Sequence, residues 1–215
     1  NMVCGSSLRA LMHAATSIRL GEHTVVIAGG MESMSNAPQL LMGQRNGKKM
    51  GDSKLIDSMI HDGLWDVYNN MHMGNTGEVV AKECSIDRRQ ADQFAAQSHL
   101  KASKAWDEGW FDWETFPVSI PQRRGEPIVL DRDEGVRSDT TAEGLANLRT
   151  VFDKDGIVTA GNASTLNDGA SAVLVTSEAF ANEQGWEIIA TIEDYCTAGV
   201  EPERVMSAPI PAVNN

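Results

Sequence analysis

The chain opens with Asn1-Met2-Val3-Cys4-Gly5-Ser6-Ser7-Leu8, in which a cysteine lies among small residues directly before an amphipathic segment. Apolar residues in that segment recur at the 3.6-residue period of a helix, up to a stop at Gly21: Leu8, Leu11, Met12, Ala15 and Ile18. The pattern predicts a helix with Cys4 at its N-terminus. Free backbone N–H groups and the helix dipole stabilise an anion there, so we expect Cys4 to act as a thiolate nucleophile. A cysteine that only fills buried space is the alternative interpretation.

The composition is that of an ordinary globular protein, with 215 residues of which 41% are apolar and 22% charged. This length can bury a sizeable core in one or two domains. No run of 18 apolar residues occurs, so we expect no membrane partner. The formal net charge of -12 argues against nucleic acid as a partner, because a phosphate backbone attracts basic surfaces. An anionic ligand would need a local basic pocket.

The three cysteines, Cys4, Cys84 and Cys196, lie far apart and form no C-x-x-C pair. This spacing disfavours both a zinc site and a disulfide framework, and it favours a reducing compartment. The sequence therefore predicts no metal centre.

Three regions follow one another along the chain, at residues 1–34, 35–160 and 161–215. In the first, the predicted helix is followed by a continuously apolar strand at residues 24–28, which we expect to be buried on both faces and to end at Gly29-Gly30. The second region is a long, charged insertion with helices at residues 76–81 and 87–106. Asp87 is the predicted N-cap of the later helix, with Gln90 as its capping-box partner.

The third region resumes an alternation of strands and helices. We expect a turn at residues 167–169, a strand at 170–176, a helix at 177–184 ended by Gly185, and a strand at 188–195. These expectations place Cys84 near a helix end and Cys196 near a strand end.

Four stretches resemble the thiolase family, which transfers acyl groups between coenzyme A thioesters. They occur in the order that the family has, at residues 1–6, 28–35, 72–76 and 158–164. The resemblance implies an α/β, thiolase-like fold with α-β-α-β-α layers. It makes residues 1–34 part of the N-terminal half, residues 35–160 an inserted coenzyme A-binding loop domain of mixed helices, and residues 161–215 the return of that half and the start of the C-terminal half.

The resemblance also implies covalent catalysis by Cys4. The cysteine at this position in thiolases attacks an acyl thioester and becomes acylated, and a second acyl-CoA carbanion then attacks the intermediate. The reverse reaction cleaves a 3-ketoacyl-CoA. Backbone N–H groups at a helix N-terminus suit this chemistry because each donor to the oxyanion contributes on the order of 3 kcal/mol.

Three residues match positions along the pantetheine channel of the family. His72 and Met73 correspond to a His-Met pair that lines this channel and the acyl pocket, and Leu64 corresponds to another channel position. Without the resemblance, His72 would be interpreted as a histidine of a surface loop. Gly74 and Thr76 beside it favour close approach of a ligand to the backbone.

Four residues match other coenzyme A contacts of the family. Ser164 corresponds to a serine that hydrogen-bonds the pantetheine arm, Ala160 to a neighbouring contact, and Phe152 to an aromatic residue beside the pantetheine. Arg137 corresponds to a residue near the adenine end. The alternatives are a plain turn at residues 161–164 and a merely solvated arginine.

The resemblance implies that acyl-CoA and coenzyme A are the substrates, with no cofactor and no metal. It also implies a homo-oligomer, a dimer or a tetramer, because residues 35–51 resemble the region through which tetramers of the family associate. The expected location is cytoplasmic, or mitochondrial or peroxisomal in a eukaryote. Met73 and the stretch Gly63-Leu64-Trp65-Asp66 resemble short-chain acetoacetyl-CoA thiolases more than long-chain degradative ones.

The sequence also departs from the family pattern. Ser7 and Thr165 replace common glycines, and Gly144 replaces a common serine. Thiolases also have Asn-Glu-Ala-Phe, Gly-His-Pro and Cys-x-Gly-Gly segments that supply the activating histidine and a second reactive cysteine, and none occurs here. We therefore expect an internal piece of a longer chain, inactive on its own because it lacks these acid and base groups.

Two alternative functions stay open. The first is an inactive thiolase-like protein that binds coenzyme A without turnover, which would leave Cys4 unacetylated by acetyl-CoA. The second is a condensing enzyme of the ketoacyl synthase type that uses acyl carrier protein, which would not bind coenzyme A tightly.

Overall fold

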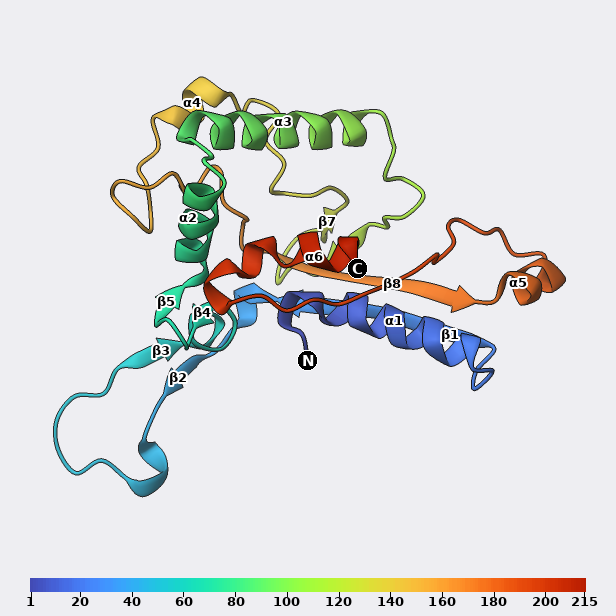
Figure 1. The fold of residues 1–215 in the computed structure, drawn as a ribbon, viewed down its shortest axis with the longest axis horizontal. Helices are drawn as coiled ribbons and strands as arrows, with labels where there is room; N and C mark the ends of the chain where they lie inside the picture. Colours follow the sequence, from blue (N-terminus) through green and yellow to red (C-terminus); the bar gives the residue numbers. More distant parts are fainter. The chain divides into compact units, whose positions relative to one another are not determined.

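The computed structural model describes residues 1–215 (Figure 1). The chain forms two compact units. Unit 1 contains Asn1–Met73 and Leu166–Asn215, and unit 2 contains Gly74–Thr165. The three-part division predicted from the sequence stays a prediction. No helix is both long and apolar enough to cross a membrane.

Unit 1 is built on a two-stranded antiparallel sheet of β1 (Val25–Ser33) and β8 (Asp168–Thr176). The register runs from Val25 opposite Thr176 to Ser33 opposite Asp168. The helix α1 (Ser6–Arg19) follows a short 3-10 turn, η1 (Val3–Gly5), and lies along this sheet in Figure 1. Alanine and valine side chains from all three elements form the core, namely Ala14, Ala28 and Val175. The predicted N-terminal helix is confirmed.

The strand β1 differs from the prediction in length and in burial. It continues through Gly29 and Gly30 to Ser33, and it is not buried on both faces, since Ile27 is 74% exposed and Met31 85%. The reason is that α1 covers one face of the sheet, so alternate side chains point away from it. The two glycines allow neighbouring elements to pack closely on β1, and they do not form a turn. A Cβ on Gly30, for example, would overlap the Ser7 side chain of α1.

Smaller elements complete unit 1. The helix predicted at residues 177–184 is confirmed as α5 (Glu178–Gln184), because Ser177 Oγ accepts a hydrogen bond from Phe180 N at 3.2 Å and Gly185 ends the helix with φ 67°. The other elements are η2 (Met34–Asn36), β2 (Gln39–Leu41), η3 (Gln44–Asn46), β3 (Leu55–Asp57), the π-helix η4 (Met59–Gly63), β4 (Trp65–Asp66), β5 (Met71–His72), η5 (Pro202–Ser207) and α6 (Pro209–Asn214).

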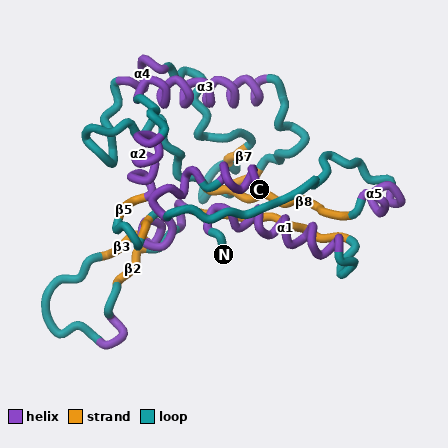
Figure 2. The backbone as a smooth tube through the Cα atoms, in the orientation of Figure 1, coloured by secondary structure: helices purple, strands orange, loops and turns teal.

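The strand predicted at residues 188–195 is wrong, as is the turn at residues 167–169. Asp168 and Gly169 already belong to β8, and the segment after α5 runs as a loop (Figure 2). Side-chain contacts, and not strand pairing, hold that loop on α1. The Tyr195 hydroxyl lies 2.6 Å from Thr16 Oγ1, and the Arg19 guanidinium lies 5.4 Å from the Tyr195 ring centre. Cys196 therefore does not end a strand.

Unit 2 is mainly helical. The predicted helices are both confirmed, as α2 (Met73–Glu83) and α3 (Arg88–Asp107), with Cys84 just after the first. The capping box is present, with Gln90 N donating to Asp87 Oδ1 at 2.7 Å and Asp87 N donating to Gln90 Oε1 at 2.8 Å. A short α4 (Ala142–Ala146) and a hairpin of β6 (Val118–Ile120) and β7 (Ile128–Leu130) complete the unit.

A carboxylate at the start of β8 makes the stability of unit 1 sensitive to acid. The Ser35 hydroxyl and the Ser35 backbone N–H donate to Asp168 and hold the pKa of its carboxyl below the ordinary value of 3.8. Because the folded state holds the proton less tightly than the unfolded state, these bonds stabilise the fold fully above pH 3.8. The stabilisation is lost as the pH falls through the lower folded pKa.

We expect Asp168→Asn to lower the free energy of unfolding at pH 7, with the difference from the wild type shrinking below pH 3.8. Urea unfolding at a series of pH values measures this. Asp52→Asn, in the exposed loop between β2 and β3, is the control and should change little. A difference for Asp168→Asn that stays constant down to the acid transition would contradict the expectation.

Candidate functional site

Cys4 lies in η1, the 3-10 turn that leads directly into α1, and it is exposed. Polar groups from both ends hold this turn. Val3 N donates to Asn1 Oδ1 at 2.7 Å, and Ser6 Oγ donates to Val3 O at 2.7 Å. Ser6 Oγ also accepts from Met2 N at 3.0 Å. The structure thus places Cys4 at the helix N-terminus, where the periodicity predicts it, and presents its side chain to the surface.

The residue before Cys4 has an unusual backbone conformation. Val3 has φ 49°, in the left-handed region that β-branched side chains rarely adopt. Such a conformation costs about 1–3 kcal/mol and persists where surrounding contacts enforce it, as the bonds from Val3 N to Asn1 and from Ser6 to Val3 O do here. The sequence motif contains Asn1 and Ser6, but its spacing gave no sign of their part in holding the turn.

Leu64, His72 and Met73 come together in unit 1. The short strands β4 and β5 pair Trp65 with His72, and Met73 N donates to Leu64 O at 2.9 Å. All three predicted side chains are half-buried. The structure therefore brings the three predicted channel residues into one small ribbon.

The turn between β4 and β5 is organised by Asp66. Its carboxylate accepts hydrogen bonds from Asn69 Nδ2 at 2.7 Å, Tyr68 N at 2.9 Å and Asn69 N at 3.3 Å. The bond from the Asn69 side chain is the main cause that lowers the pKa of Asp66 below 3.8. The carboxylate thus stays ionised at neutral pH, and its hydrogen bonds hold the turn that leads from β4 to His72 in β5.

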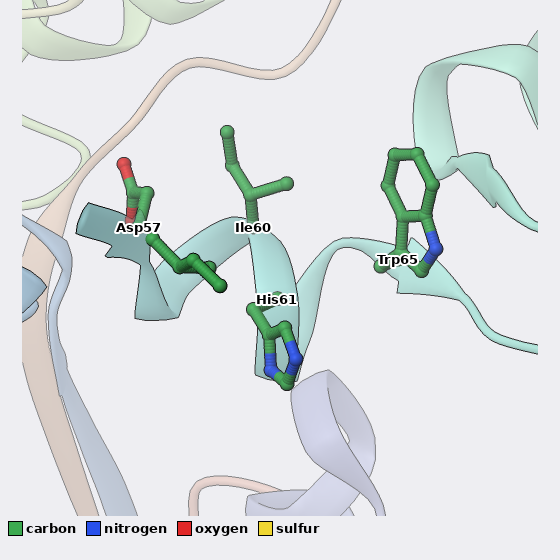
Figure 3. Close-up of a pocket in the computed structure, with 5 residues that line it drawn as sticks. Asp57, Ile60, His61 and Trp65 are labelled. Atoms are coloured by element: carbon green, nitrogen blue, oxygen red, sulfur yellow. The ribbon is translucent and has the colours of Figure 1, made fainter. Parts of the chain in front are cut away.

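A hollow of about 220 Å³ lies over η4 (Figure 3). Figure 3 shows Asp57 and Trp65 at its two ends and Ile60 between them. His61 Nδ1 lies 2.6 Å from Asp62 Oδ1 at the surface. The hollow is lined by Ile56, Asp57, Ile60, His61 and Trp65, none of which was a predicted site residue.

Phe152, Ala160 and Ser164 belong to one irregular segment of unit 2. Asn75 Nδ2 donates to Phe152 O at 3.4 Å, and a Cβ on Gly74 would overlap the Phe152 ring, so the ring lies directly on the start of α2. Ala160 lies in a tight turn in which Ala163 N donates to Thr159 O at 3.1 Å. The side chains of Ala160 and Ser164 are exposed.

Arg137 is exposed, and its backbone N–H donates to His99 Nδ1 at 3.2 Å. Two other arginines, Arg123 and Arg124, lie in the exposed loop between β6 and β7. No group of three or more His, Cys, Asp or Glu side chains could hold a metal ion.

A sequence model of the family described as "Thiolase, N-terminal domain" matches residues 1–179. The chain belongs to the thiolase family. The acetyl-CoA acetyltransferase of Cupriavidus necator is 52% identical over 212 residues, which make up 99% of this chain and 54% of that protein. The chain spans about half the length of the curated relatives that it matches.

Solved thiolase structures agree in fold. The acetyl-CoA acetyltransferase of Bacillus anthracis matches with a TM-score of 0.92 at 41% identity, over 98% of this chain and 53% of that one. The human mitochondrial 3-ketoacyl-CoA thiolase, solved in complex with CoA, matches with a TM-score of 0.92 at 36% identity, over 100% of this chain and 53% of that one. The predicted α/β thiolase-like fold is confirmed.

Proposed function

We propose that the protein carrying this chain is an acyltransferase of the thiolase type. It condenses two acetyl-CoA to acetoacetyl-CoA, or cleaves a 3-ketoacyl-CoA, through an acyl intermediate on Cys4. The observation that carries the proposal is an exposed cysteine at the start of α1 in a chain of the thiolase family. The names of the relatives, acetyl-CoA acetyltransferase and 3-ketoacyl-CoA thiolase, support it.

In the first step Cys4 Sγ bonds to the thioester carbonyl carbon, and the bond from that carbon to the coenzyme A sulfur breaks. The proton of the Cys4 thiol passes to a base and then to the departing coenzyme A thiolate. N–H groups at the start of α1 suit the oxyanion of the intermediate. In the second step a base takes a proton from the α-carbon of another acetyl-CoA, and this carbon bonds to the acyl carbon. The bond from the acyl carbon to Cys4 Sγ then breaks, and the Cys4 thiolate takes up the proton from that base.

The proposed substrate contacts follow the two clusters. Leu64, His72 and Met73 of unit 1 contact the pantetheine and the acyl group. Phe152, Ala160 and Ser164 of unit 2 contact the pantetheine arm, and Arg137 pairs with the phosphorylated adenine end. These groups bind coenzyme A thioesters as substrates, and the proposed reaction uses no cofactor.

Incubation with acetyl-CoA tests the proposal. We expect one acetyl group on the protein by intact mass, located on Cys4 by peptide mapping. The other two cysteines are also exposed and free, so Cys84→Ser and Cys196→Ser are matched controls that should still be acetylated. No acetyl group, with coenzyme A still bound, would support a coenzyme A-binding protein without turnover. Transfer from acyl carrier protein alone would support a ketoacyl synthase-type enzyme.

We also propose that the protein forms homo-oligomers, dimers or tetramers, in the cytoplasm. The exposed basic loop at residues 42–54 supports this, because it carries Arg45, Lys48, Lys49 and Lys54 against the single acid Asp52. The chain as a whole has a net charge of -12, so a second copy offers an acidic surface.

Light scattering tests this expectation by measuring the molar mass in solution. The wild type should have the mass of an oligomer, and Lys48→Glu with Lys49→Glu should lower that mass, most clearly at low salt. A monomeric wild type at micromolar concentration would contradict it.

A further inference from the structure

A buried carboxylate lies in the first turns of α3. Asp92 is 1% exposed, although carboxylates are seldom buried without partners. Its Oδ2 accepts from Arg88 Nε at 2.8 Å, one helical turn earlier, and its Oδ1 accepts from Asn162 Nδ2 at 2.9 Å. Both oxygens are therefore used, and the charge of Arg88 compensates that of Asp92.

Asn162 connects this carboxylate to the turn that contains Ala160. Its Nδ2 also donates to Ile157 O at 2.9 Å, while its Oδ1 accepts from Thr159 N at 2.7 Å. Thr159 is fully buried, and its Oγ1 accepts from Gly161 N at 3.2 Å. One amide side chain thus ties the backbone that leads into the turn, at Ile157 and Thr159, to α3.

Two neighbouring elements fix the same segment. Glu78 of α2 accepts from Ile157 N and from Val158 N, each at 2.8 Å. The Arg88 guanidinium donates to Leu145 O at 2.7 Å and Leu148 O at 2.9 Å. A Cβ on Gly161 would come within 2.5 Å of the side chains of the same two leucines, so the turn lies directly against them.

The chemistry of a carboxylate decides the orientation of Asn162. An ionised Asp92 only accepts hydrogen bonds, so it faces the Nδ2 group of Asn162 and never its Oδ1. The Oδ1 is thereby directed to Thr159 N, which sets the conformation of the turn. An amide at position 92 could both donate and accept, and it would satisfy either orientation of Asn162.

We propose that Asp92, acting through Asn162, is a positioning residue for coenzyme A. It holds Ala160 and Ser164, which flank Asn162 at two residues' distance on either side, in the conformation that receives the pantetheine arm. This inference rests on the proposed function, because it takes these two residues as coenzyme A contacts. Neither Asp92 nor Asn162 touches the ligand through its own carboxylate or amide in this proposal.

The test compares Asp92→Asn with Asp107→Asn in the intact protein. Asp107 is the matched control, since it lies on the same helix and pairs with Arg132 at 3.0 Å, but its side chain is 62% exposed. We expect Asp92→Asn to raise the Kd for coenzyme A by roughly tenfold to a hundredfold, the range for a lost hydrogen bond to a charged group. The KM for acetyl-CoA should rise similarly, with kcat within about twofold, whereas Asp107→Asn leaves all three within about twofold.

A double-mutant cycle separates positioning from a general loss of stability. Asn162→Ala alone should raise the Kd by a similar factor, and adding Asp92→Asn should then raise it no further, because the two residues act through one contact. Independent, multiplying effects would overturn the inference. If Asp92→Asn does not fold, the Kd of the Asn162→Ala variant for coenzyme A is the test. A folded Asn162→Ala variant with an unchanged Kd would overturn the inference.

Coenzyme A binding by the wild type distinguishes failure of the proposed function from failure of this inference. If the wild type binds no coenzyme A, the proposed function fails and the inference fails with it. If the wild type binds coenzyme A and Asp92→Asn binds equally well, only the inference fails.

Discussion

Replacing Cys4 by alanine should abolish acyl transfer while leaving the fold intact. The side chain is exposed and lies outside the core of Ala14, Ala28 and Val175, so its loss creates no cavity. Its sulfur is the proposed nucleophile, and no hydroxyl or thiol replaces it in Cys4→Ala. We expect kcat to fall on the order of 10⁴-fold or more, as for removal of other covalent nucleophiles.

The measurement is the rate of acetoacetyl-CoA thiolysis, together with urea unfolding. Cys84→Ala and Cys196→Ala are the controls, because these cysteines are equally exposed and free. Both should keep kcat within about twofold. A Cys4→Ala variant that is folded and keeps a substantial part of the activity would contradict the acyl-cysteine mechanism. Binding of coenzyme A should survive in this variant, which separates the loss of chemistry from the loss of substrate.

Local sequence signals predicted the helices well. The 3.6-residue period of α1, the Asp87–Gln90 capping box of α3 and the Ser177 and Gly185 ends of α5 all depend on residues a few positions apart. The capping box and the helix ends of α3 and α5 are held by hydrogen bonds between residues close in sequence, and the apolar period of α1 shows which face packs on the sheet, so each signal can be read locally.

Features that depend on distant parts of the chain were missed. The loop at residues 188–195 has an apolar, strand-like sequence, but contacts of Tyr195 with Thr16 and Arg19 fix it as a loop. The bond between Asp92 and Asn162 joins residues 70 positions apart, and a buried acid four residues after Arg88 looks like a surface ion pair in the sequence. Tertiary contacts of this kind override local preference.

Part of the candidate site could also be predicted from local sequence, and part depends on the fold. Position at a helix start was predictable for Cys4, whereas the bond between Met73 N and Leu64 O shows only that these two residues lie together, and their place in a channel stays a prediction. The hollow beside Ile60 and Trp65 was not predictable, since its lining depends on the rare π-helical turn η4, which has no periodic signature in five residues.

Gly29→Ala should destabilise unit 1 strongly. A Cβ at this position of β1 would overlap Ser171 O and lie 2.9 Å from Ala172 Cα, so it meets the backbone of β8 rather than a movable side chain. The two strands must separate or bend to make room. We expect the free energy of unfolding to fall by about 3 kcal/mol, the upper end of the usual range for overpacking. The entropic gain of replacing glycine, about 0.4–1 kcal/mol, offsets only part of this.

Gly169→Ala is the matched control. Gly169 lies in β8 of the same sheet, opposite Glu32, and a Cβ there meets nothing within 4 Å. The same chemical change should therefore be neutral or stabilise by up to about 1 kcal/mol. Urea midpoints of both variants, compared with the wild type at equal m-values, measure the difference. Equal midpoints for the two variants would show that β1 and β8 do not approach at Gly29 as closely as the structure has them. A loss confined to Gly29→Ala would show that Gly29 is required for the pairing of β1 with β8, since the backbone of β8 leaves no space for a side chain there.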